Sequence, residues 1–252
     1  MAAAVALTEF GRFVQDVLQW CMPEFGYVRL ADGFVQPSSI MPQKRNPVGV
    51  EHARSLASRA VGEALGVMVA VHNTPFGDIV DTEDDLQPLV FAALHDGARA
   101  VGLLAAALRG AEFDRAKLEA DASRGGITTT ELADVLARDH GLPFQLAHRV
   151  VAAFNRAAAA APDRPRADVL ADTSEQMAGT PIRYTEQALA DLLSPRHFVD
   201  VRHTLGGPAG DEIARALEGS QQALEHDRRA LADTRAALTA AAARLRARKA
   251  AL

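Results

Sequence analysis

The chain has 252 residues, of which 48% are hydrophobic and 5% aromatic, and its formal net charge is −5 at pH 7. This length allows one large or two smaller domains with a buried core. The arginines are scattered among acids instead of forming a basic stripe, which argues against nucleic-acid binding. The single cysteine, Cys21, excludes a disulfide framework and a cysteine-based metal site.

No membrane-directed segment is expected from the sequence. No apolar run reaches about 18 residues without a charge, which argues against a transmembrane helix. The first residues lack the basic region of a signal peptide, so the expected location is the cytoplasm.

Three long helices are predicted in residues 1–110, over 3–20, 47–72 and about 83–109, because apolar residues recur there at helical spacing. The apolar side of the first helix comprises Val5, Leu7, Phe10, Phe13, Val14, Val17 and Leu18. The residues of the second that are available for packing are Val48, Leu56, Val61, Leu65, Met68 and Val69. Polar breaks between the helices favour an antiparallel bundle, and the abundance of alanine favours close packing.

Residues 111–252 are predicted to form a second all-helical domain. Shorter segments separated by glycine and proline occupy 111–206, and no alternation of period two is long enough to propose a sheet. One helix is expected from about Asp211 to the end, with leucines spaced by sevens at Leu217, Leu224, Leu231, Leu238 and Leu245. Two interpretations of this stripe stay open: a coiled-coil contact, or a single helix that packs on its own domain. The predicted fold class is all-α.

The most informative segment is the loop 37–47, in which residues 38–47 read Ser-Ser-Ile-Met-Pro-Gln-Lys-Arg-Asn-Pro. Asn46 is a good helix N-cap and Pro47 a good first helical residue. The free N–H groups of a helix N-terminus suit a carboxylate or an oxyanion, and Lys44 adds a full positive charge. The segment therefore predicts an anion site beside a nucleophile or base.

The order of residues in this loop resembles the signature of the fumarase/aspartase superfamily. Every fixed position of that signature is met, by Ser38, Ser39, Met41, Pro42, Lys44 and Asn46. Residues 24–28, 30–34, 127–133 and 141–148 resemble argininosuccinate lyases in particular. The resemblance covers only the back half of that protein, so the chain is expected to be its carboxy-terminal portion: part of the central helix bundle, then the small carboxy-terminal domain.

The resemblance implies a β-elimination that releases fumarate, with no metal and no organic cofactor. Ser38 would be the general base, Lys44 and Asn46 would stabilise the dianionic intermediate, and Ser39 and Met41 would help to hold the substrate. Glu51 would orient a histidine from the missing half; alternatively it is only a first-turn partner of the helix dipole. The family implies a homotetramer in which three subunits contribute to each active site.

Residues 78–86 depart from the argininosuccinate lyase pattern, although Asp78 and Glu83 occupy substrate-contacting positions. Leu86 replaces a lysine, and Glu83 replaces a glutamine. The acidic run 81–85 does not match a calcium loop, so no metal site is predicted. The expected reaction splits argininosuccinate into arginine and fumarate. Two alternatives stay open: a C–N lyase acting on another N-substituted aspartate, and a catalytically inactive helical protein that associates with itself.

Overall fold

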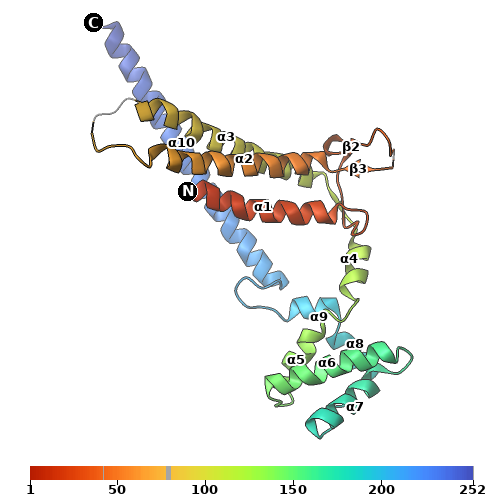
Figure 1. Cartoon of the computed structure of the whole chain (residues 1–252). Coiled ribbons are helices and arrows are strands. Elements are labelled where there is room, and N and C mark those ends of the chain that lie inside the picture. Colours follow the sequence, from red (N-terminus) through yellow and green to blue (C-terminus); the bar gives the residue numbers. More distant parts are fainter. Residues whose placement is uncertain (42, 78–80, 252) are drawn as a thin grey trace. The chain divides into compact units, whose positions relative to one another are not determined.

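The computed structural model describes residues 1–41, 43–77 and 81–251, except for the side chains of residues 81 and 83. The predicted all-α class is confirmed, because ten α-helices account for most of the described residues (Figure 1). The chain forms two compact units, Met1–Asp121 and Ala122–Leu252. The predicted domain boundary between residues 110 and 111 stays a prediction.

The first unit is built on three long helices, α1 (Ala2–Trp20), α2 (Val48–Val71) and α3 (Asp81–Arg109). α2 packs against both α1 and α3. All three helices lie close to the predicted ranges. The helix start differs in detail: Pro47 is the N-cap, and Asn46 lies in a strand whose backbone is already paired. The prediction that Asn46 caps α2 was therefore wrong.

Alanine forms the packing surface of α2. Its fully or almost fully buried side chains include Ala53, Ala57, Ala60 and Ala64, whereas Leu65, Met68 and Val69 are 48%, 51% and 66% exposed. Of the larger apolar residues expected to pack, Leu56 and Val61 are partly buried against the core, whereas Leu65, Met68 and Val69 lie on an exposed side of the helix. Small side chains allow two helix backbones to approach closely, and α3 contributes Ala93, Ala100 and Ala107 at seven-residue intervals.

Two short antiparallel ribbons join the helices of this unit, and the sequence did not predict them. β1 (Val28–Arg29) pairs with β4 (Glu112–Phe113), and β2 (Gln36–Pro37) pairs with β3 (Arg45–Asn46). Two-residue strands are too short to show an alternating pattern. A 3-10 turn, η1 (Asp32–Phe34), lies between β1 and β2, and α4 (Arg115–Ala122) follows β4.

α3 also meets the length and composition criteria for a membrane span. An 18-residue window within Asp84–Arg109 has a mean hydropathy of 1.4, and 28% of that window is buried. Asp96 lies in the middle of this helix, with its side chain only 5% exposed, and forms ion pairs with Arg59 and Arg99. Packing on α2 and an ion-paired buried carboxylate are typical of a core helix.

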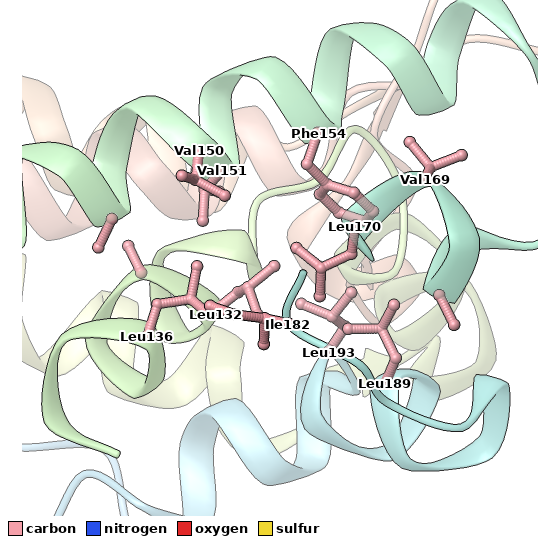
Figure 2. Packing of buried hydrophobic residues seen from close by; sticks show 13 residues of the cluster. Leu132, Leu136, Val150, Val151, Phe154, Val169, Leu170, Ile182, Leu189 and Leu193 are labelled. Carbon is pink, nitrogen blue, oxygen red and sulfur yellow. The ribbon is translucent and has the colours of Figure 1, made fainter. Parts of the chain in front are cut away.

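The second unit has its own apolar core, formed by α5 (Thr129–Arg138), α6 (Phe144–Ala160), α7 (Arg166–Ala178) and α8 (Glu186–Leu192). Figure 2 shows Leu132 and Leu136 of α5, Phe154 of α6, and Leu170 and Leu189 of the next two helices within one cluster; all five are at most 1% exposed. α9 (Pro195–Asp200) and α10 (Gly210–Ala250) follow.

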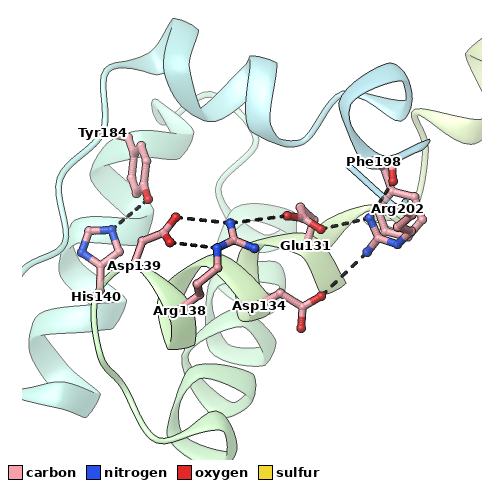
Figure 3. Close-up of polar contacts among 8 residues, drawn as sticks. All are labelled: Glu131, Asp134, Arg138, Asp139, His140, Tyr184, Phe198 and Arg202. Carbon is pink, nitrogen blue, oxygen red and sulfur yellow. Dashed lines mark hydrogen bonds and ion pairs between the residues drawn. The ribbon is translucent and has the colours of Figure 1, made fainter. Parts of the chain in front are cut away.

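A polar network lies at one edge of this core (Figure 3). The Glu131 side chain is 4% exposed, and its Oε2 accepts a hydrogen bond from Nη1 of Arg202. Nη2 of Arg202 lies 3.8 Å from Asp134, and Arg138 pairs with Asp139 at 2.8 Å. These contacts tie the segment after α9 to α5.

Candidate active-site loop

The signature loop is held as the tip of the β2–β3 ribbon. Gln36 pairs with Asn46, and Pro37 pairs with Arg45, so both ends of the segment 38–44 are brought together. α2 begins two residues after β3. Four of the predicted site residues, Ser38, Ser39, Met41 and Lys44, therefore lie on one hairpin tip, and Asn46 lies at its base.

The base of this hairpin is fixed by Arg45, which the sequence analysis did not single out. Its Nη2 donates to the carbonyl oxygen of Leu30 at 3.0 Å, and its Nη1 lies 2.8 Å from Oδ1 of Asp32. Both partners precede Arg45 by more than ten residues. A lone arginine within a polar loop gives no sequence signal for such a contact.

A close approach of η1 to the start of α2 sets the direction of the loop. Gly49 is buried, and a Cβ atom at this position would lie 2.9 Å from Cδ1 of Phe34. A side chain there would push Phe34 away, so glycine is required for this packing. The contact places the first turn of α2 directly beside the segment that leads into the loop.

The hydroxyl of Ser38 is held by the backbone of the loop itself. Its Oγ accepts hydrogen bonds from the backbone N–H of Met41 at 3.1 Å and of Ile40 at 3.3 Å. Two backbone donors on one oxygen favour negative charge on that oxygen. Among the described residues, no side-chain contact joins Lys44 to Ser38.

The remaining predicted site residues are exposed or lie outside the described residues. Ser39, Lys44 and Glu51 are exposed, and Met41 is 43% exposed. Glu51 occupies the first turn of α2 and faces solvent, a position compatible with both of its proposed roles. Asp78 and the side chain of Glu83 lie outside the described residues.

A shallow open groove lies elsewhere in the first unit, between α1 and α2, and contains none of the predicted site residues. Its apolar floor includes Leu7, Ala57 and Val61, and Arg54 lines its edge. Nη1 of Arg54 donates to Oε1 of Gln15 at 2.8 Å. Within the described part of the chain, no group of three or more His, Cys, Asp and Glu residues is placed to hold a metal ion.

Comparison with known proteins gives two family matches and long relatives. Residues 1–62 match the family model described as Lyase, and residues 126–200 match the model described as Argininosuccinate lyase C-terminal. "Argininosuccinate lyase 2" of Agrobacterium fabrum is 35% identical over 219 residues, which cover 86% of this chain and 44% of that protein. Argininosuccinate lyase of Methanoculleus marisnigri is 32% identical, with 85% and 43% covered. The chain thus spans less than half the length of these relatives.

Solved structures give the same result for the fold. A variant of EDDS lyase with bound fumarate superposes with a TM-score of 0.78 at 25% identity, over 92% of this chain and 46% of that one. The 3-carboxy-cis,cis-muconate lactonizing enzyme of Pseudomonas putida superposes with a TM-score of 0.62 at 23% identity, which concerns the fold alone.

Proposed function

Because this chain belongs to the argininosuccinate lyase family, and corresponds to its carboxy-terminal portion, we propose that it contributes the signature loop to a C–N lyase active site. The reaction is the β-elimination of argininosuccinate to arginine and fumarate. The location consistent with this proposal is the cytoplasm, and no metal or organic cofactor takes part in the steps proposed here.

The observation that carries the proposal is the environment of Ser38 Oγ. A serine hydroxyl is a poor base unless its deprotonated form is stabilised, and the N–H groups of Met41 and Ile40 already point at this oxygen. Deprotonated Ser38 would remove the proton from the carbon next to the substrate carboxylate. Fixed donors need no reorganisation as the charge moves, which is why preorganised amides lower the barrier.

The other loop residues take the roles that complete this step. Loss of the proton leaves a dianionic aci-carboxylate; the C–N bond then breaks as an acid from another chain segment protonates the leaving nitrogen, which releases arginine and fumarate. The exposed ammonium group of Lys44 and the amide of Asn46 would stabilise the dianion, while Ser39 and Met41 would hold the substrate. We assign to Glu51 the orientation of a histidine contributed by another chain segment.

The site requires more than one copy of the chain in this proposal. Large apolar side chains remain exposed on the three-helix unit, among them Val69 at 66%, Phe91 at 67% and Leu94 at 57%. Exposed apolar surface of this kind marks association sites. We therefore propose a homo-oligomer, a tetramer as in the family, in which loops from different copies meet around the small-molecule substrate.

Residues 78–86 support a second candidate substrate. The sequence has Asp78, Glu83 and Leu86 where argininosuccinate lyases usually carry a different set of polar residues. A site built around polar partners strongly rejects a ligand that cannot satisfy them, so a different set of polar residues selects a different substrate. The second candidate is therefore a C–N lyase acting on another N-substituted aspartate, with the same loop and the same elimination.

The direct test is the appearance of fumarate, followed by its ultraviolet absorbance, with argininosuccinate and the purified chain at high concentration. We expect Ser38→Ala and Lys44→Ala each to abolish fumarate release. Ser58→Ala is the matched control, because this exposed hydroxyl donates only to the carbonyl of Arg54 on its own helix. Wild-type rates in either loop variant would contradict the assigned roles.

If no fumarate is formed, adding the missing amino-terminal portion would distinguish an incomplete site from an unsuitable substrate. The amino-terminal portion of the Agrobacterium fabrum relative, supplied as a separate protein, would complete a site that lacks only that portion. Activity restored with argininosuccinate supports the first candidate. Continued silence with argininosuccinate, combined with turnover of another N-substituted aspartate, favours the second candidate. Silence with every such substrate favours the catalytically inactive, self-associating protein.

A further inference from the structure

α10 carries a long apolar stripe that the other elements of its own unit leave exposed. The helix has 41 residues, and none of its residues is buried. Its large apolar side chains are all about half exposed or more, from 47% to 70%: Ile213, Leu217, Leu224, Leu231, Leu238 and Leu245. At 1.5 Å per residue the helix is about 60 Å long (blue in Figure 1).

The strict seven-residue spacing of the leucines points to a helical partner. In a straight α-helix, such a stripe drifts around the axis by about 20° per heptad. From Leu217 to Leu245 there are four heptads, so a flat partner surface would lose contact with one end of the stripe. A second helix that supercoils around α10 follows the drift along the whole length.

The charges of α10 are segregated along its length, which determines the direction of the partner. Residues 210–230 carry five acids and three arginines, whereas residues 231–251 carry one acid and five basic residues. A parallel pair in register would bring the basic ends together, among them Arg244, Arg246, Arg248 and Lys249. An antiparallel pair places each acidic half beside a basic half.

We propose that α10 pairs antiparallel with α10 of a second copy of this chain, centred on Leu231. In this register Leu217 lies level with the partner's Leu245, and Leu224 with the partner's Leu238. The five leucines of each helix then form one continuous apolar contact. Two copies of one helix related by a twofold axis satisfy this arrangement with a single self-complementary surface.

The charged residues agree with the same register. Asp227 comes level with the partner's Arg235, Glu218 with the partner's Arg244, and Arg229 with the partner's Asp233. In this register none of the charged residues of α10 lies level with a residue of like charge. Shifts that are not multiples of seven place each leucine level with a residue other than leucine, and a shift of one heptad leaves one of the five leucines of each helix without a leucine of α10 opposite, so the centred register is favoured.

This contact is independent of the proposed lyase chemistry, because it involves only α10 and none of the loop residues. It also differs from association through the three-helix unit, which uses other exposed side chains. Failure of the fumarate assay would therefore leave the α10 pairing unaffected, and loss of the α10 pairing would leave the roles of the loop residues unaffected.

Disulfide formation between engineered cysteines tests the direction of pairing. In the whole chain carrying Cys21→Ser, we expect Leu217→Cys and Leu245→Cys proteins to form a covalent dimer when they are mixed and mildly oxidised. Mass spectrometry would identify the product as one copy of each. Each protein alone should migrate as a monomer on a non-reducing denaturing gel. A covalent dimer from Leu217→Cys alone, or none from the mixture, would overturn the proposal.

Sedimentation equilibrium tests the strength of the contact with a matched pair of variants. Leu224→Glu with Leu238→Glu buries four carboxylates in each paired contact, so we expect the dissociation constant of this association step to rise at least about 100-fold. Ala240→Glu with Ala247→Glu adds the same charge on the opposite side of α10 and should change it by less than about tenfold. Equal effects of the two double variants would contradict an interface at the leucine stripe.

Discussion

Arg202 and Glu131 are 71 residues apart in sequence, yet Nη1 of Arg202 lies 2.9 Å from Oε2 of Glu131. The same nitrogen donates to the carbonyl oxygen of Phe198 at 2.6 Å, and the guanidinium carbon lies 3.4 Å from the centre of the Phe198 ring. Arg202 therefore connects the end of α9 to the buried first turn of α5 (Figure 3). The contact fixes the segment before α10 against α5 of the same unit.

Replacement of this arginine should strongly destabilise the second unit. Arg202→Ala leaves the 4% exposed side chain of Glu131 without its closest cation, and removal of one partner of a buried ion pair costs about 3–5 kcal/mol. The measurement is urea-induced unfolding followed by far-ultraviolet circular dichroism. Arg164→Ala is the control, because the Arg164–Asp172 pair is about half exposed and should contribute at most about 1 kcal/mol. Similar losses in both variants would contradict a special role for Arg202.

Ser174 provides a second stability prediction, based on a buried backbone group. Its side chain is completely buried, and its Oγ accepts from the N–H of Ile182 at 2.7 Å. Ser174→Ala leaves that N–H without a partner, which costs about 1–3 kcal/mol. Ser220→Ala on the exposed face of α10 removes only a hydroxyl that donates to Ala216. A thermal unfolding curve should shift for the first variant and hardly move for the second; a reversed order would refute the interpretation.

Asp96 makes the stability of the first unit depend on pH. Burial acts to raise the pKa of this carboxyl, but the charge of Arg59 and hydrogen bonds from Arg99 and His95 outweigh it and lower the pKa. A lowered pKa in the folded state means that folding favours the ionised form. The resulting stabilisation is fully present above the pKa of the unfolded chain, about 3.9, and is lost as the pH falls through the folded-state pKa.

The free energy of unfolding should therefore decrease as the pH falls below the unfolded-state pKa and through the lower folded-state pKa, and Asp96→Asn should flatten part of that decrease. Asp163→Asn, at an exposed position between α6 and α7, serves as the control and should keep the wild-type slope. A wild-type slope in the Asp96→Asn variant would show that acid sensitivity arises elsewhere.

Arg45 should control how often the signature loop opens. Arg45→Met keeps the length of the side chain but removes the donors to Leu30 and Asp32, a loss of roughly 0.5–1.5 kcal/mol. We expect hydrogen exchange in the peptide that spans 38–44 to accelerate by up to about tenfold. Arg12→Met provides the comparison, since Arg12 pairs only with exposed Glu9. Unchanged exchange in Arg45→Met would mean that β2–β3 pairing alone holds the loop.

Helical periodicity and turn residues located the long helices well, because these signals are local. α1, α2, α3 and α10 lie within a few residues of their predicted ranges. The predicted packing residues of α2 were right for Leu56 and Val61 and wrong for Leu65, Met68 and Val69, for a physical reason. Hydrophobicity favours the larger Leu65 and Met68, whereas the close approach of α1 and α3 selects the alanine side.

For the candidate site, too, local sequence patterns predicted some features and only the tertiary structure determined others. The residue types and spacing of 38–47 indicated an anion-binding loop, and the order of residues indicated the family. The sequence also placed the leucine stripe on the last helix, but it left open whether that stripe packs on its own domain. The structure shows the stripe exposed, with no buried residue on α10. That exposure depends on where every other element lies.

The sequence by itself determined the class of fold, the positions of the long helices and the identity of the signature loop. These properties follow from patterns within a few turns of the chain. Only the tertiary structure decided that Asn46 enters a strand instead of capping α2, that Arg45 holds the loop, and that Arg202 reaches Glu131. Each of these contacts joins residues that are distant in sequence, and no local pattern encodes their distance in space.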